Sequence, residues 1–165
     1  MNSLPDHTGP VAFWRLDDDR HRATWDSGEG SRLKGGRWSP VGVRAVYCSL
    51  DPATAILEVA VHKGFKTLNS VPHVLSSAAL LVAWNDVHVV EPRHVPNPLW
   101  LYPTAFSRGQ QAFGDALLKA HDFVAIPSAV SRHSWNLVFD ADRAAGKYHL
   151  RLQELLDLDP RLDPP

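Results

Sequence analysis

A strand-like run that passes directly into a capped helix is the feature of this chain that most constrains its fold. Residues 45–50 are mostly apolar and predict a strand. Asp51 then provides a good N-cap, and Pro52 is well placed at the first helical position. The helix is predicted to run to Lys63, where Gly64 ends it. These residues therefore predict a strand and a helix joined by a tight turn.

Elsewhere in the chain, strand-like runs outnumber helical ones. Apolar or aromatic runs predict strands within residues 11–16, 71–84, 87–91, 123–126, 135–139 and 148–152, and helical spacing predicts one further helix at 110–121. Because strands and helices do not alternate regularly, we expect an α+β domain with a mixed or antiparallel sheet core rather than a doubly wound parallel sheet. The polar, glycine-rich segment 21–43 has little periodicity and predicts a long irregular loop of the kind that binds ligands.

The length and composition of the chain are those of one globular domain. Its 165 residues, 44% hydrophobic and 21% charged, are enough to bury a core. A formal net charge of -1 provides no broad basic field, so direct nucleic-acid binding is not expected. We expect the domain to span residues 12–152, with flexible termini at 1–11 and 153–165.

Cysteine usage and the hydropathy pattern bear on the compartment. The single cysteine, Cys48, excludes an intrachain disulfide and a zinc site built from several thiolates, and it suits a reducing cytoplasm. Residues 1–10 lack the basic start and apolar run of a secretory signal, and no run of about 18 apolar residues predicts a membrane helix. We therefore expect a soluble cytoplasmic protein.

Glu58 is the most unusual residue of the predicted helix. Its neighbours along the helix are almost all apolar, so little of the helix surface is left for a carboxylate to face water. Carboxylates in such surroundings need a partner and are common at functional sites. The alternative is that Glu58 lies on a narrow exposed stripe with Thr54 and His62, and the pattern alone favours neither interpretation.

Arg37 follows two glycines, whose backbone amides can approach an anion closely while the guanidinium donates to a phosphate. Arg15 and Arg32 are candidates to join it. The spacing of the two glycines and Arg37 by itself favours a structural turn over an anion site.

Tyr47 could stack on a flat ring or pack in the core, and Ser128 could donate to a ligand or close a turn. The sequence has no metal-binding helix motif of the His-Glu-x-x-His kind, so we expect no metal. It has no nucleophile elbow around any serine, so triad hydrolysis is not expected either.

Several short motifs follow one another along the chain: Arg15, residues 35–42 (GGRWSPVG), Val46-Tyr47, residues 55–58 (AILE), residues 113–115 (FGD), and residues 126–130 (IPSAV) with Asn136. Together they resemble the RES-domain family, over about residues 12–152. The chain departs from that family at Phe139-Asp140, where Asn-Pro is usual, and at Ser39, where asparagine is common.

The resemblance implies a fold similar to ADP-ribosyltransferases of the diphtheria-toxin kind, with NAD⁺ as substrate. By motif position Arg37, Glu58 and Ser128 take the three places that name the family, and they are the expected catalytic residues. The expected nucleotide-binding residues are Arg15, Gly36, Arg37, Trp38, Tyr47 and Asn136. We expect Glu58 to stabilise positive charge on the ribose, Arg37 and Arg15 to hold the pyrophosphate, Tyr47 to position the nicotinamide ribose end, and Ser128 to contact the nicotinamide or order Arg37.

The resemblance also implies a function in a bacterial toxin–antitoxin pair. The toxin would cleave the nicotinamide–ribose bond of NAD⁺ with water or phosphate as acceptor and so arrest growth. One alternative is ADP-ribose transfer to a host protein, and another is a non-catalytic binding module that uses its tryptophans to hold a partner. The expected partner is an Xre-like antitoxin in a hetero-oligomer, a toxin homodimer also being compatible with the sequence.

Overall fold

A single seven-stranded sheet organises the part of the chain that the computed structural model describes, which is residue 4 and residues 9–162. The order of the strands in the sheet is β4-β5-β6-β2-β1-β3-β7. The pair β4–β5 is parallel and the other pairs are antiparallel. The strands are β1 (Ala12–Asp18), β2 (Ala45–Ser49), β3 (His73–Leu80), β4 (His88–Val89), β5 (Val124–Pro127), β6 (Trp135–Asp140) and β7 (Tyr148–Leu155). The expected α+β class with a mixed sheet is confirmed.

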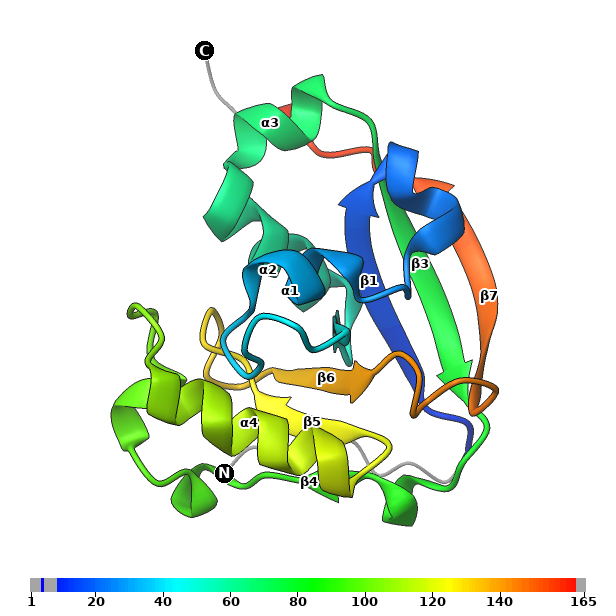
Figure 1. Cartoon of the computed structure of the whole chain (residues 1–165). Helices are drawn as coiled ribbons and strands as arrows, with labels where there is room; N and C mark the ends of the chain where they lie inside the picture. The colour runs from blue at the N-terminus through cyan, green and yellow to red at the C-terminus, as the bar shows by residue number, and fades with distance from the viewer. Residues whose placement is uncertain (1–3, 5–8, 163–165) are drawn as a thin grey trace.

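Helices cover one face of this sheet in two separate regions. In Figure 1, α2 and α3 lie beside β1 in the upper half of the molecule, and α4 lies across β5 and β6 in the lower half. The α-helices are α1 (Glu29–Lys34), α2 (Pro52–Lys63), α3 (Phe65–Ser70) and α4 (Arg108–Ala120). Short 3-10 turns are η1 (Asp19–Thr24), η2 (Trp84–Asp86), η3 (Pro92–His94), η4 (Pro98–Leu101) and η5 (Pro160–Leu162).

Helix α2 has the bounds and the caps that its sequence predicts. The Asp51 carboxylate accepts hydrogen bonds from the backbone N–H of Thr54 at 2.8 Å and from its hydroxyl at 2.6 Å. At the other end Gly64 adopts φ +79°, and its N–H donates to the carbonyl of Ala60 at 2.8 Å. A side chain would be strained at that φ, so glycine fits the end of the helix.

Three buried clusters divide between the two faces of the sheet, because alternate residues of a strand point in opposite directions. Along β2, Val46 and Cys48 join the cluster on the face opposite α2 and α4, around Phe13 and Phe139. The other two clusters lie on the face that carries the helices. One includes Trp38 and Ile126 beneath α4, and the other packs under α2 and α3 with Leu16, Ala55, Leu68 and Leu75. The cavity described below lies between these two helical regions.

The structure differs from the sequence expectations in the loop 21–43 and in α3. The loop includes part of η1 and the whole of α1, both too short to produce a periodic signal. The six residues of α3 follow Gly64 directly, and one of them, Leu68, is buried. The strand expected within residues 71–84 is narrower and spans His73–Leu80, after which Leu81 is 61% exposed.

The two ends of the expected domain also differ in detail. Strand β7 continues to Leu155, inside the segment 153–165 expected to be flexible, because its backbone pairs with β3 as far as Val74. Val11, at the edge of the other expected terminus, is 2% exposed. Within the two segments expected to be flexible, residues 1–3, 5–8 and 163–165 lie outside the described residues.

Candidate active site

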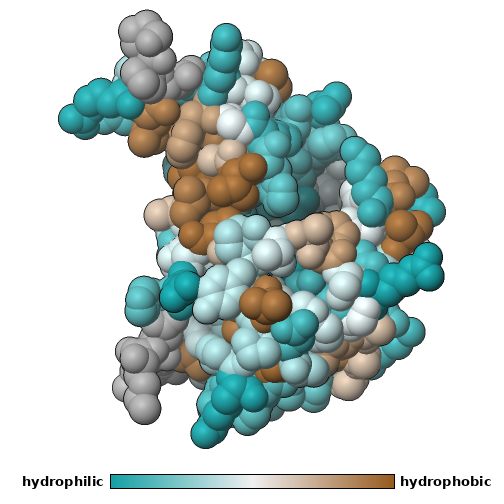
Figure 2. All heavy atoms as spheres, turned by 90° about the vertical axis from the view of Figure 1, so that its left-hand side faces the viewer, coloured by the Kyte–Doolittle hydropathy of each residue, from teal (hydrophilic) through white to brown (hydrophobic). Residues whose placement is uncertain are grey.

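A cavity of about 540 Å³ opens on the helical face of the sheet, between α2, the glycine loop before β2 and the segment that precedes α4. The surface is hollowed on the side of the molecule that Figure 2 shows, with hydrophilic and hydrophobic residues around the hollow. Of the site residues expected from the sequence, all except Ser128 line this cavity: Arg15, Gly36, Arg37, Trp38, Tyr47, Glu58 and Asn136. Residues far apart in the chain are thus brought to one place.

Glu58 faces the cavity from the middle of α2. Ala55 and His62, three residues before and four after it, lie on the same face of the helix and line the same cavity, as does the adjacent Val59, so this side of the helix forms one wall. The alternative exposed stripe is not what the structure shows, because Thr54 is 4% exposed and bonds to Asp51. Glu58 is therefore a half-buried carboxylate in a cavity rather than a solvated surface charge.

Two side chains from the sheet hold one oxygen of this carboxylate. The Ser128 hydroxyl donates to Glu58 Oε1 at 2.9 Å, and the Asn136 amide donates to the same atom at 2.6 Å. Asn136 Oδ1 in turn accepts from the Ser49 hydroxyl at 2.9 Å. Within the described residues Oε2 accepts no hydrogen bond, so the carboxylate is oriented but keeps one oxygen for a ligand.

Ser128 lies directly after β5 and is 1% exposed. Besides donating to Glu58, its Oγ accepts from the backbone N–H of Val130 at 3.2 Å, which closes a turn. The interpretation of Ser128 as a turn residue is therefore confirmed, and its donation to a ligand such as nicotinamide stays a prediction. Its side-chain contact is with Glu58 rather than with Arg37.

Arg37 lies across the cavity mouth and donates to the backbone of a distant segment. Its guanidinium donates to the carbonyls of Trp100 at 3.3 Å, Tyr102 at 3.2 Å and Thr104 at 3.2 Å. Burial lowers the pKa of Arg37, while the negative charge of Glu58 acts in the opposite direction, and the group stays protonated. A guanidinium has more N–H donors than these three bonds use, so Arg37 retains donors for an anion.

Tyr47 and Gln111 brace the glycine loop that carries Arg37. The Tyr47 hydroxyl bonds to Ser39 Oγ at 2.8 Å and accepts from the N–H of Trp38 at 3.0 Å. The Gln111 side chain donates to the carbonyls of Gly36 and Ser39 at 3.0 and 3.2 Å. A Cβ on Gly36 would lie 2.5 Å from the Tyr47 hydroxyl, so only glycine allows this approach.

The wall formed by Tyr47 and Trp38 is largely buried. Burial raises the pKa of Tyr47 to about 12, so its hydroxyl stays neutral. Trp38 is 3% exposed, and its ring packs edge-on against Phe113. Both aromatic residues line the cavity, but their bonds and packing hold the loop in place, which corresponds to the packing alternative for Tyr47.

Arg15 lies on β1 and also lines the cavity. It donates to the carbonyl of Tyr47 at 2.8 Å and pairs with Asp17 at 2.9 Å. Its Nε is buried without a hydrogen-bond partner among the described residues. Arg32, the other arginine considered as a partner of Arg37, pairs with Glu29 at 2.5 Å on α1 and does not line the cavity.

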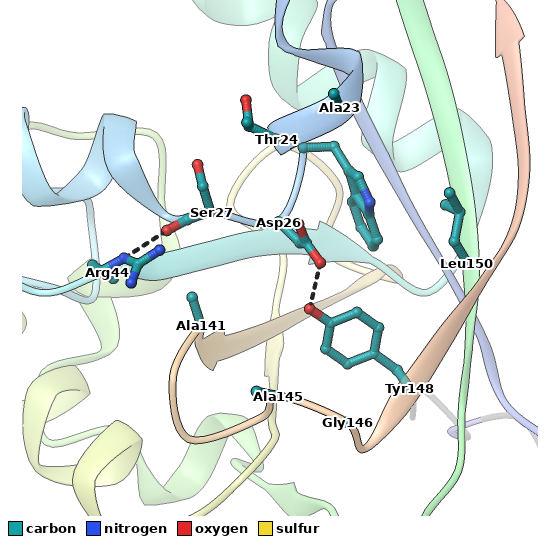
Figure 3. Close-up of a pocket in the computed structure, with 11 residues that line it drawn as sticks. Ala23, Thr24, Asp26, Ser27, Arg44, Ala141, Ala145, Gly146, Tyr148 and Leu150 are labelled. Carbon is teal, nitrogen blue, oxygen red and sulfur yellow. Dashed lines mark hydrogen bonds between the residues drawn. The ribbon is translucent and has the colours of Figure 1, made fainter.

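A second hollow, of about 500 Å³, lies beside η1 and β7 and contains none of the expected site residues. Figure 3 shows the Tyr148 hydroxyl pointing at Asp26 across it, a bond of 2.7 Å. Burial and this carboxylate raise the pKa of Tyr148. Arg44 at its rim donates to the carbonyl of Ser27 at 2.9 Å and to Asp142 at 2.8 Å. These polar groups bond to one another, so the first cavity is the better candidate for the active site.

Sequence reasoning missed the segment before α4. Thr104, Ala105 and Phe106 line the cavity, although the sequence predicted neither an element nor a site residue between positions 91 and 110. No periodic pattern in the sequence indicates that this segment forms a cavity wall.

Among the described residues, no group of three or more His, Cys, Asp or Glu side chains is arranged to hold a metal ion. None of the described helices is long and apolar enough to span a membrane.

Known proteins resemble this chain in sequence and in fold. "Toxin Res" of Photorhabdus laumondii is 26% identical over 157 residues, covering 93% of this chain and 95% of that protein. "Prs ADP-ribosylating toxin" of a Sphingobium species is 43% identical over 54 residues, 32% of this chain and 34% of that protein. The crystal structure of the M. tuberculosis MbcT-MbcA toxin-antitoxin complex shares the fold with a TM-score of 0.70 at 23% identity, covering 90% of this chain and 85% of that one. Finally, the family model described as "RES domain" matches residues 12–159, and this chain belongs to the RES domain family.

Proposed function

We propose that this protein is the toxin of a toxin–antitoxin pair and that it cleaves the nicotinamide–ribose bond of NAD⁺, with water or phosphate as acceptor. The observation that carries the proposal is the Glu58 carboxylate, held at one oxygen by Ser128 and Asn136 inside a cavity that Arg37 and Arg15 also line. The names of two relatives, a toxin and an ADP-ribosylating toxin, support the same conclusion.

The proposed chemistry needs a fixed negative charge beside the ribose. Loss of nicotinamide leaves positive charge on the ribose, as in the oxocarbenium-like transition states of glycoside hydrolysis. A carboxylate that is already oriented stabilises this charge without reorganising during the reaction. Glu58 fits that role, and because nicotinamide is a reasonable leaving group, the cavity needs no second carboxyl group as general acid.

The arginines are proposed to bind the pyrophosphate. Arg37 keeps unused donors beside the cavity mouth, and Arg15, whose side chain is 26% exposed, lines the same cavity from β1. A guanidinium recognises phosphate oxygens with paired N–H donors, which also fixes the orientation of the ligand. The cavity volume of about 540 Å³ lies within the usual range for small-ligand sites.

Transfer of ADP-ribose to a host protein is the second candidate function. It is favoured by the match to an ADP-ribosylating toxin, which is the higher of the two sequence identities although it covers only 32% of this chain. Both candidates use the same Glu58 and differ only in the acceptor that reaches the ribose. The acceptor therefore has to be identified by experiment.

The test is incubation of the purified protein with NAD⁺ labelled in its adenylate half, with and without phosphate and with a bacterial lysate. We expect nicotinamide release in every arm and label in small products, whose identity changes when phosphate is the acceptor. Label on protein in the lysate arm alone would establish the second candidate. Absence of nicotinamide release in all arms would contradict both.

The proposed partner is an Xre-like antitoxin that forms a hetero-oligomer with this chain. The shared fold with the toxin–antitoxin complex supports a partner of this kind. Arg37 and Arg15 at the cavity would attract an acidic or carboxyl-terminal chain segment, which would block the site. An antitoxin that inhibits fully after removal of its terminal segments would contradict this mode of inhibition.

Replacement of Ser128 by alanine tests its action through Glu58. We expect kcat to fall about 10-fold to 10²-fold with KM for NAD⁺ unchanged, because one of the two bonds that orient the carboxylate is lost. Ser134→Ala is the matched control, since that hydroxyl bonds to Ser131 in the same loop and not to Glu58. Steady-state kinetics on both variants measures the difference, and equal kcat values would refute the assignment.

A further inference from the structure

Phe106 is an exposed aromatic side chain on the wall of the cavity. It is 48% exposed, and no other exposed large hydrophobic residue in the described part of the chain lines this cavity. Single exposed apolar side chains are common on protein surfaces, so exposure alone does not mark a site. Phe106 differs from the other exposed apolar residues because its place on the cavity wall puts it within reach of a bound ligand.

The other aromatic residues of the cavity already have contacts. Trp38 packs against Phe113, Tyr47 bonds to the glycine loop, and Trp14 packs against the cluster under α2. Phe106 belongs to none of the three clusters, and within the described residues its ring pairs with no other ring. It is therefore the aromatic face that remains available to a ligand.

The segment that carries Phe106 is anchored on both sides. Before it, Arg37 holds the carbonyls of Trp100, Tyr102 and Thr104, and the Tyr102 ring lies 4.8 Å from the Arg132 guanidinium carbon. After it, Ser107 caps α4 by accepting from the N–H of Gln110 at 3.2 Å. A side chain between two anchors is positioned in advance, which lowers the entropy lost when a ligand binds.

We propose that Phe106 stacks on a flat ring of the nucleotide in the cavity. The inference rests on the proposed function, which supplies a ligand with two such rings, nicotinamide and adenine. Stacking between a base and an aromatic side chain is strong enough to change affinity about tenfold or more. Phe106 is then a binding residue that sets affinity and ring selectivity, beside the charged groups that act on the ribose and the pyrophosphate.

The test is calorimetric binding of NAD⁺, ADP-ribose and nicotinamide mononucleotide to the full chain carrying Glu58→Gln, which slows turnover. In this background we compare Phe106→Ala, Phe106→Leu and Phe106→Trp. We expect NAD⁺ to bind about tenfold more weakly to the alanine and leucine variants and within about twofold of the parent to the tryptophan variant. Leu99→Ala, which removes a 62% exposed side chain outside the cavity lining, is the control.

The fragments identify the ring. If adenine is stacked, ADP-ribose loses affinity with NAD⁺ and nicotinamide mononucleotide does not, and the reverse holds for nicotinamide. A leucine variant that binds as tightly as the parent, or equal affinities for all variants, overturns the proposal. Nicotinamide release by the parent chain is a separate measurement, so stacking without turnover contradicts only the proposed function, and turnover without an effect at Phe106 contradicts only this inference. A parent chain that binds none of the three ligands overturns both.

Discussion

Replacement of Glu58 by glutamine is expected to slow nicotinamide release from NAD⁺ by about 10²–10³-fold without unfolding the protein. The side chains have nearly the same size, and the amide oxygen of glutamine can still accept from Ser128 and Asn136, which donate to Glu58 Oε1. What glutamine removes is the negative charge that opposes the charge developing on the ribose. The variant therefore separates the electrostatic role of Glu58 from its packing.

The measurement is single-turnover release of nicotinamide, with thermal unfolding recorded on the same preparations. Glu154→Gln is the matched control, because Glu154 is an exposed carboxylate on β7, outside the cavity lining. We expect the control to retain the parent rate. A Glu58→Gln protein with the parent rate would remove the proposed mechanism, because no other residue has been assigned to this charge.

The second large effect is expected from Gly114→Ala, which changes stability rather than chemistry. Gly114 lies in α4, and a Cβ there would come within 2.1 Å of the backbone oxygen of Trp38. Because that atom belongs to the backbone, the helix and the glycine loop have to move apart. We expect the free energy of unfolding to fall by about 1–3 kcal/mol, although alanine favours the helix itself.

Urea denaturation measures this loss, and Gly109→Ala provides a control in the same helix. The nearest atom to a Cβ at Gly109 is 3.5 Å away, an ordinary contact, so we expect that variant to gain about 0.5–1 kcal/mol. Because the loop behind Gly114 carries Arg37, the Gly114 variant should also turn over NAD⁺ more slowly. If the two variants have equal free energies of unfolding, the glycine loop at Trp38 can move away from α4 without loss of stability, which would contradict this prediction.

Local signals in the sequence predicted the elements that depend on neighbouring residues. The Asp51 cap and Gly64 end of α2 are such signals, and the predicted helix is confirmed at both bounds. The α+β class followed from counting strands, and it too is confirmed. In contrast, the sequence did not predict α3, because one buried residue in six produces no period. The extension of β7 was missed because its exposed residues show no alternation and pairing with β3 is long-range.

The candidate site was predicted through a family resemblance, while its internal contacts depend on the fold. Nothing in the pattern around Ser128 indicates that its hydroxyl reaches a carboxylate 70 residues earlier in the chain. Likewise, Arg37 bonds to carbonyls at least 63 residues away, which no spacing rule predicts. The roles assigned to the individual site residues stay predictions until the variants are measured.

The strand pairing beneath Glu58 restricts how relatives of this protein can change in length. Asn136 lies opposite Ser49 of β2 and Ile126 of β5, so its side chain reaches the carboxylate only in this register. An insertion or deletion of one residue inside β6 would turn Asn136 to the other face of the sheet. We therefore expect relatives to differ in length in the loop between β5 and β6 beyond the turn at Ser128, and to keep the length of β6 itself.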